Sequence, residues 1–171
     1  MKAHLITPSE VVNAGRPMGS QVDKERLLSY ITETEMMYVK PVLGERLYLS
    51  LLEDETDSNA KYAMLLNGGS YSVNGEMFTF VGLKAAISYF VFAKNVMVGD
   101  FVPTRFGIVM KEADYSSHIS TAERSACYND TLEVAHSYLQ DCVAYCRRMG
   151  LLTNSIGSPT ASGGIRIRKI G

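Results

Sequence analysis

The stretch STAERSACYNDTLEVAHSYLQDCVAYCRRM (residues 120–149) sets the fold class, because its apolar residues recur every three or four positions. This spacing predicts one helix of about 45 Å with an apolar stripe along one side. Gly150 follows the stretch, and glycine is common just past the end of a helix. The stripe consists of Leu132, Ala135, Leu139, Cys142, Cys146 and Met149.

A second helix, predicted over residues 82–98, gives the long helix a surface to pack against. It is apolar almost all round, which is typical of the central element of a core. A membrane span needs about 18 or more consecutive apolar residues, and Lys84 and Lys94 interrupt this run. We therefore expect a buried core helix and no contact with a membrane.

Shorter helices are predicted nearer the N-terminus. Asp23 suits the N-cap of a helix over residues 24–39, which we expect Pro41 to end because its ring clashes with the carbonyl four residues back. Residues 44–54 predict another helix. The stretch NAKYAMLLNGG (residues 59–69) predicts a further one that stops at its two glycines.

The segments between the helices predict a small β-hairpin and two extended ends. Asn74-Gly75 between alternating segments is a strong hairpin signal, while residues 99–117 form a long excursion with a short β-like patch. The predicted fold is mainly α, a helical bundle with a small β-hairpin. Its expected parts are an extended N-terminal arm (residues 1–21), a helical domain (residues 22–150) and an extended basic C-terminal tail (residues 151–171).

The C-terminal tail differs in charge from the rest of the chain. No Asp or Glu follows Asp141, whereas residues 147–171 contain five basic residues, so this end carries +5 and residues 1–146 carry −6. Within GSPTASGGIRIRKIG (residues 157–171), isoleucine and arginine alternate, which predicts a strand with one apolar and one basic face. A lone strand is unstable in water. It either folds back onto its own domain, pairs with another protein or stays a solvated end.

Cysteine usage indicates a reduced compartment and no metal. The three cysteines cannot all pair within the chain, and the N-terminus lacks the apolar stretch of a signal peptide, so we expect a protein used inside a cell or an assembly made there. Cys142 and Cys146 lie one helical turn apart, as two thiolate ligands would. They also lie on the apolar stripe, so we favour a core role and expect neither a metal nor a cofactor.

The search for an active site ends at Glu35. Phosphate-binding loops, metalloprotease motifs and nucleophile elbows are absent from the sequence. Glu35 falls between Ile31 and Tyr38 on the apolar side of its helix, where a carboxylate is costly without a partner. It is either a general acid or base, or a structural carboxylate bonded to a tyrosine, an arginine or a backbone N–H. We favour the structural interpretation and predict no enzyme and no catalytic residue.

Nucleic-acid binding is the alternative function that the charge pattern supports. The tyrosines lie mostly at core or boundary spacing and the basic tail has no aromatic residue, which argues against stacking on single strands. Arg166, Arg168 and Lys169 still suit non-specific contact with phosphates. The alternative is thus a non-specific DNA-associated module that acts through its tail.

The stretch ETEMMYVKPVLGERLYLSLL (residues 33–52) resembles the head–tail connector proteins of tailed bacteriophages, also called adaptor, head-completion or neck ring proteins. It is closest to the ring proteins of crAss-like phages. The similarity extends to residues 67–69, 80–96 and 104–114 and to the long last helix, so it covers residues 23–150. The motif residues are Glu35, Tyr38, Pro41, Gly44, Leu47 and Tyr48.

The resemblance implies a structural virion protein. Such proteins form a ring in the phage neck, usually of twelve copies, which joins the portal to the tail and extends the DNA channel. The implied partners are further copies of the chain, the portal protein, the next ring or tail-hub protein, and DNA contacted non-specifically in the channel. The implied location is the neck of the virion, assembled in the host cytoplasm.

Two interfaces are expected on this interpretation. The strand in the tail suits β-addition to an exposed sheet edge of the portal or of a neighbouring subunit. The linker 153–164 reaches up to about 40 Å at 3.3–3.6 Å per residue. The expected binding residues are Ile165, Arg166, Ile167, Arg168, Lys169 and Ile170. A subunit interface is expected at the apolar residues of the 99–117 excursion, namely Phe101, Val102, Phe106 and Val109.

Overall fold

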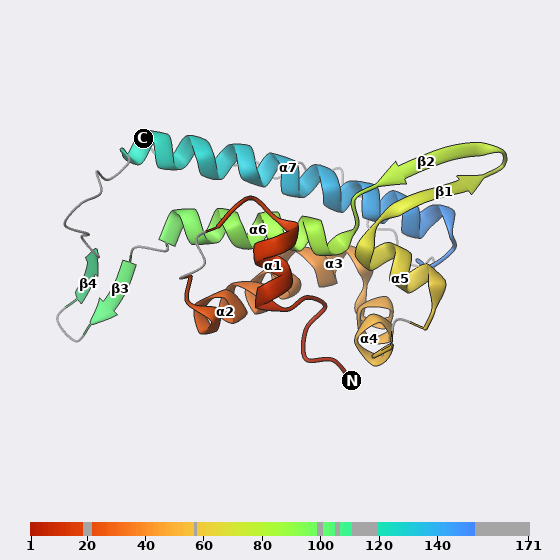
Figure 1. The fold of residues 1–171 in the computed structure, drawn as a ribbon, viewed down its shortest axis with the longest axis horizontal. Coiled ribbons are helices and arrows are strands. Elements are labelled where there is room, and N and C mark those ends of the chain that lie inside the picture. The colour runs from red at the N-terminus through yellow and green to blue at the C-terminus, as the bar shows by residue number, and fades with distance from the viewer. Residues whose placement is uncertain (19–21, 57, 99–100, 105–106, 111–119, 153–171) are drawn as a thin grey trace.

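The computed structural model describes residues 1–18, 22–56, 58–98, 101–104, 107–110 and 120–152 (Figure 1). Helices account for most of these residues, and a β-hairpin projects from them. The predicted class, a mainly α-helical bundle with a small hairpin, is confirmed.

Two long helices, α6 (Leu83–Val98) and α7 (Thr121–Arg148), lie side by side and form the spine of the molecule (Figure 1). The predicted stripe of α7 faces the core, with Ala135, Cys142 and Cys146 fully buried. A capping box between Ser120 and Glu123 starts α7. Among the described residues, no helix combines the length and apolarity that crossing a membrane requires.

The shorter helices pack against α6 and against one another. They are α2 (Lys24–Thr34), α3 (Lys40–Leu43), α4 (Glu45–Glu53) and α5 (Ala60–Asn67), and α2 and α5 contact α6 directly. In Figure 1 the first three lie on the side of α6 away from α7. The predicted helices over 44–54 and 59–67 are confirmed, and Asn59 caps the second by accepting from the N–H of Lys61.

Pro41 does not end the first long helix, contrary to the prediction. A wider turn, η1 (Glu35–Val39), follows α2, and in it the N–H of Lys40 donates to the carbonyl of Glu35, five residues back. This shift in register lets Pro41 occupy the first turn of α3, where a proline needs no N–H. The helix ends instead at Gly44, whose φ is +79°.

Residues 8–14 are an exception to the predicted extended arm over 1–21, because they form helix α1 (Pro8–Ala14). Thr7 and Glu10 make a capping box at its start, and Pro8 stands at a position that favours proline. Leu5, Ile6 and Val11 are buried in the core. Residues 1–7 are neither helix nor strand, but the burial of apolar side chains holds this segment against the helices.

The predicted hairpin is confirmed, with strands β1 (Gly69–Val73) and β2 (Glu76–Phe80) in antiparallel register. Asn74 and Gly75 form its turn, and both have positive φ, 53° and 84°. Such a turn matches the natural twist of the strands. The hairpin extends away from the helices at the C-terminal end of α7 (Figure 1).

The excursion between α6 and α7 contains a second pair of strands. β3 (Phe101–Thr104) and β4 (Gly107–Met110) are antiparallel, which agrees with the β-like patch expected near residue 107. Val102 stands opposite Val109 in this register. The two described segments between α6 and α7 therefore pair with each other.

Candidate functional site

The motif that runs from Glu35 to Tyr48 forms one corner of the molecule. The wide turn η1 sets Glu35 on the buried side of the chain, and the backbone at Gly44 redirects the chain from α3 into α4. As a result, the hydroxyl of Tyr48 on α4 reaches back and donates to Oε2 of Glu35 at 2.9 Å. Residues thirteen positions apart thus share one buried hydrogen bond.

Both oxygens of the Glu35 carboxylate have partners, although the side chain is 0% exposed. The backbone N–H of Leu5 donates to Oε1 at 2.7 Å, and Nδ1 of His4 lies 3.1 Å from Oε2. The N–H of Lys2 donates to the carbonyl of Leu52 at 2.8 Å in the same region. The Glu35 carboxylate in η1 therefore links the N-terminal segment to α4.

This geometry fits a structural carboxylate better than a catalytic one. Burial, together with the adjacent Glu35 carboxylate, raises the pKa of the Tyr48 phenol, so Tyr48 remains a hydrogen-bond donor. A general acid or base must come within hydrogen-bond reach of a substrate. The cavity of about 440 Å³ beside this segment is lined by His4 and Leu5 but not by Glu35. Glu35 has the tyrosine and backbone partners of the structural interpretation.

Tyr38, the second motif residue, joins the corner to the spine. Its ring stacks on that of Phe90 in α6, with centroids 4.3 Å apart and planes at 7°. His136 of α7 meets the same pair edge-on, 5.7 Å from Tyr38 and 5.0 Å from Phe90. The sequence pattern that runs from Glu35 to Tyr48 is therefore one physical unit that ties together η1, α4, α6 and α7.

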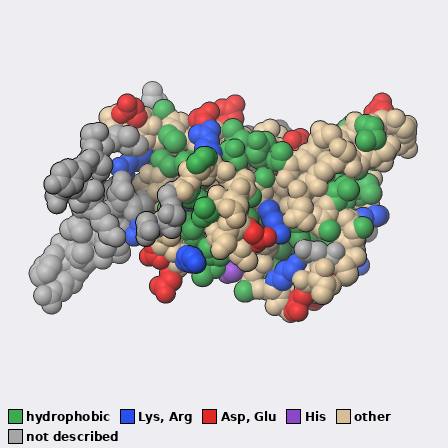
Figure 2. Space-filling model, in the orientation of Figure 1, with side chains coloured by type: hydrophobic (Ala, Val, Ile, Leu, Met, Phe, Trp, Pro, Cys, Tyr) green, Lys and Arg blue, Asp and Glu red, His purple; other side chains and the backbone are tan. Residues whose placement is uncertain are grey.

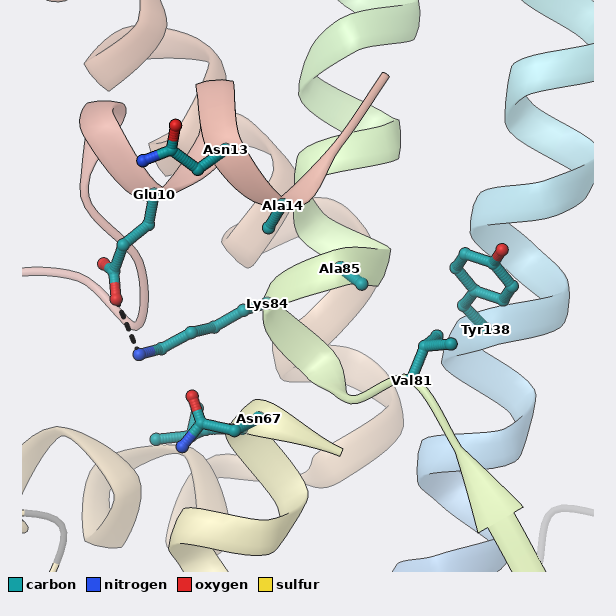
Figure 3. Close-up of a pocket in the computed structure, with 9 residues that line it drawn as sticks. Glu10, Asn13, Ala14, Asn67, Val81, Lys84, Ala85 and Tyr138 are labelled. Carbon is teal, nitrogen blue, oxygen red and sulfur yellow. Dashed lines mark hydrogen bonds and ion pairs between the residues drawn. The ribbon is translucent and has the colours of Figure 1, made fainter. Parts of the chain in front are cut away.

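A pocket of about 460 Å³ lies between α1, α5, α6 and α7 (Figure 3). Nζ of Lys84 reaches from α6 to Oε1 of Glu10 on α1 at 2.7 Å, while Tyr138 borders the pocket from α7. Burial alone would raise the pKa of Glu10, but hydrogen bonds from Lys84 and Thr7 outweigh it and hold the pKa below its ordinary value. The ion pair attaches α1 to the spine and leaves the pocket without net charge from these two groups.

The base of the β1–β2 hairpin is a close crossing of two backbone segments. Gly68 and Gly82 both have positive φ, +78° and +89°, and a Cβ atom on Gly82 would lie 2.3 Å from the Gly68 nitrogen. Only glycine fits at such an approach. The two strands therefore leave the helical body from one fixed point.

The inner face of the hairpin is anchored to the end of α7. Phe80 stacks on Tyr145 with centroids 4.8 Å apart, and Tyr71 meets Tyr145 edge-on at 4.9 Å. The Arg148 guanidinium lies 3.8 Å from the centroid of the Phe78 ring and donates to the Tyr71 hydroxyl at 2.8 Å. These contacts hold the inner face of both strands against one helix.

The outward-facing side chains of this hairpin are exposed, and neither of its edges pairs with another strand of the described chain. The sheet has two strands only, so each strand has one unpaired edge within these residues. Met77 is 69% exposed, and Figure 2 shows hydrophobic and acidic side chains side by side at the far end of the hairpin. The outward-facing residues are Ser70, Ser72, Met77 and Thr79.

The start of the C-terminal tail lies against the motif corner. After α7, the N–H of Leu151 donates to the carbonyl of Cys146 and that of Gly150 to Arg147, a pattern typical of a glycine-terminated helix. Leu151 and Leu152 then line a groove of about 560 Å³. Pro41 and Gly44 of the motif line the same groove. The tail thus begins beside the residues on which the connector resemblance rests.

The predicted interface residues fall partly beyond the described ranges. Phe101 and Val102 lie in β3 and Val109 in β4. Phe106 and the tail residues 165–170 lie outside the described residues. The candidate tail interface therefore stays a prediction from the sequence.

The two cysteines of the α7 stripe behave as core residues. Burial raises the pKa of both thiols, that of Cys146 to about 12, so both remain neutral near physiological pH. A thiolate is the form that binds metal. Across the described part of the chain, no group of three or more His, Cys, Asp or Glu side chains is placed to hold a metal ion.

Sequence reasoning missed several residues that organise these sites. Thr7 and Glu10 stand three residues apart, which is the spacing of a capping box, and this signal predicts the start of α1. The alternation in the hairpin signals an aromatic inner face, but nothing local indicates that Arg148 covers it. The contacts of Glu35 with His4 and Leu5 span about thirty residues, and no spacing rule predicts them.

A family model described as a family of unknown function (DUF6712) matches residues 39–149, and the chain belongs to this family. The match runs from the end of η1 through α7 and includes the β1–β2 hairpin. It excludes Glu35, the N-terminal segment and the tail. No curated protein matches the chain, and no solved structure matches it either.

Proposed function

We propose that this member of DUF6712 is a structural protein of a bacteriophage virion that forms a ring in the neck, joins the portal to the tail and extends the DNA channel. The proposed partners are further copies of the chain, the portal protein and the next ring or tail-hub protein. The proposed location is the virion neck, reached by assembly in the host cytoplasm.

The observation that carries this proposal is the motif corner. A pattern that resembles phage connectors in sequence corresponds to one packed unit, in which Glu35 and Tyr48 are joined by a buried hydrogen bond and Tyr38 packs on the spine. The contacts made by both oxygens of the buried Glu35 carboxylate also support a scaffold over an enzyme centred on this residue.

The distribution of charge supports an assembly role for the tail. Residues 1–150 carry a net charge of −4 and the tail, residues 151–171, carries +3, which favours contact between the tail of one copy and the body of another protein or copy. Many such weak contacts in one ring would reinforce one another through avidity. In this proposal residues 165–170 dock on the portal or on the adjoining subunit, and the β3–β4 segment contributes to the contact between subunits.

Electron microscopy tests the proposal. The full-length chain is mixed with the portal ring encoded by the same genome and compared with a chain truncated after Leu152. We expect an added ring of density with the full-length chain and loss of that density on truncation. Density with both chains would keep the connector function and remove the tail from it. No density with either chain would contradict the proposal.

DNA binding is the second candidate, because every charged residue after Asp141 is basic. If the tail contacts phosphates, binding of the full-length chain to duplex DNA falls steeply as salt rises, since each contact releases counterions. The chain truncated after Leu152 is the matched control. Equal DNA binding by both chains would contradict a role for the tail in it.

A further inference from the structure

We propose that an unpaired edge of the β1–β2 hairpin receives residues 165–170 of an adjoining copy of this chain as an added β-strand. This inference rests on the proposed ring, and it names the surface on each subunit that accepts its neighbour. The surface consists of backbone groups at the hairpin edges, on residues that no motif singles out.

The register of the hairpin identifies the backbone groups that are free. In a hairpin with a two-residue turn, the pair next to the turn, here Val73 and Glu76, exchanges both of its hydrogen bonds, and every second pair does the same. The intervening pairs, Ser72–Met77 and Ser70–Thr79, direct their N–H and C=O groups outward. β1 therefore offers the backbone of two serines, and β2 that of Met77 and Thr79.

The hairpin is already held in the conformation that strand addition requires. The glycine crossing at its base and the contacts of Arg148 and Tyr145 with its inner face fix both strands on α7. A preformed edge loses little conformational entropy when a partner binds. Unpaired edges of this kind are templates for a further strand, and proteins normally protect them unless they are used.

The tail has the length and pattern of the missing strand. Isoleucine and arginine alternate over residues 165–168, so an added strand would continue the apolar inner face with Ile165 and Ile167 and place Arg166 and Arg168 on the outer face. Six residues match the five-residue strands of the hairpin. The linker 153–164 reaches up to about 40 Å, enough to leave one subunit and arrive at the next.

Charge favours the tail of this chain as the added strand, and the proposed ring requires that this tail come from an adjoining copy. The body that carries the hairpin is negative and the tail is positive, so the tail of one copy is attracted to the body of the next. A serine-rich outer face places no basic side chain opposite the arginines of the tail. Exchange of tails between neighbours also joins subunits, as the proposed ring requires.

Photo-crosslinking distinguishes an adjoining copy from the same copy. A photoreactive amino acid replaces Arg166 in the full-length chain, and ¹⁵N-labelled and unlabelled chains are mixed before assembly and irradiation. We expect crosslinked peptides that join the tail to residues 69–80 and contain one labelled and one unlabelled partner. Crosslinks to the hairpin within one chain only, or no crosslinks to the hairpin, would overturn the inference.

Proline substitutions test the backbone groups themselves. Ser72→Pro removes an outward N–H from β1 and Thr79→Pro removes one from β2, and neither N–H takes part in the pairing of the hairpin. We expect one of the two substitutions to weaken self-association about tenfold or more. Ser72→Ala and Thr79→Ala change the side chains, keep the N–H groups and should assemble normally. Unchanged association of both proline variants, with near-ultraviolet circular dichroism showing an intact fold, would overturn the inference.

The two proposals fail in different ways. If the portal mixture shows rings while both proline variants assemble normally, the neck function stands and the hairpin is not the receiving surface. If mixed-isotope crosslinks form between copies but no ring binds the portal, strand exchange stands and the neck function fails.

Discussion

The corner around Glu35 and the β1–β2 hairpin differ in how their polar groups find hydrogen-bond partners. Both contain polar groups that need hydrogen-bond partners. At the corner, Glu35, Tyr48 and the N–H of Leu5 satisfy one another out of contact with water. At the hairpin, one edge of each strand is left unpaired by the rest of the described chain. The corner should therefore govern stability, and the hairpin should govern association.

Removing the Glu35 carboxylate should give the largest effect on stability. In Glu35→Ala the N–H of Leu5 and the hydroxyl of Tyr48 are left buried without a partner, so we expect the free energy of unfolding to fall by about 3–5 kcal/mol. Urea denaturation measures this. Glu33→Ala is the control, since Glu33 is half exposed and pairs with Lys94 at the surface. A loss below about 1 kcal/mol would contradict the role of the corner.

Glu35→Gln separates structure from chemistry at the same position. The amide oxygen can still accept from Tyr48 or Leu5, so we expect an intermediate loss of stability and normal ring assembly wherever the variant is folded. Loss of biological function with unchanged stability would instead indicate that the carboxylate acts chemically.

A substitution at the base of the hairpin should also affect stability. Gly82→Ala should disrupt the close crossing of the two backbone segments there. The new Cβ would meet the Gly68 nitrogen at 2.3 Å, with φ at +89°, and we expect a loss of about 2–4 kcal/mol. Gly75→Ala is the matched control, because Gly75 has φ +84° but nothing within 4 Å of its Cβ position. It should cost only about 1 kcal/mol. Equal losses would contradict the close crossing.

Arg148→Ala should loosen the hairpin more than it destabilises the whole fold. It removes the guanidinium from the Phe78 ring and the hydrogen bond to Tyr71, and we expect a loss of about 1–2 kcal/mol. Hydrogen exchange should speed up in residues 69–80 while α6 stays protected. Arg147→Ala, at an exposed neighbouring position, should leave this exchange unchanged. Unaltered exchange in Arg148→Ala would show that the arginine does not anchor the hairpin.

A smaller effect concerns pH at the ion pair between α1 and α6. The pKa of Glu10 is lower in the folded state than its ordinary value, so its stabilising contribution is present above that value and is lost as pH falls through the folded pKa. The native chain should therefore lose more stability than Glu10→Gln between neutral pH and about pH 3. Parallel pH curves for the two chains would contradict this linkage.

Local periodicity predicted the parts of the fold that depend on neighbours in sequence. The stripe on α7, the apolar helix α6 and the Asn74-Gly75 turn are each encoded within a few residues, and all were found where expected. Helix α1 also had a local signal, the capping-box pair Thr7 and Glu10 with Pro8 at its start, although an extended arm was predicted there.

Long-range contacts explain what the sequence could not predict. The wide turn η1 depends on a hydrogen bond between residues five positions apart, and this bond allows the helix to continue through Pro41. No sequence pattern predicts this turn. The sequence indicated which kinds of group could bond to Glu35, among them a tyrosine and a backbone N–H. It did not identify Tyr48 and Leu5 as those partners. The free edges of the hairpin became visible only once both strands and their neighbours were placed.

The central claim is most directly tested by electron microscopy of the assembled ring at a resolution that traces individual strands. The account predicts a third strand on the β1–β2 hairpin, continuous through residues 153–164 with the α7 of the adjoining subunit. A ring in which this hairpin remains two-stranded would contradict it.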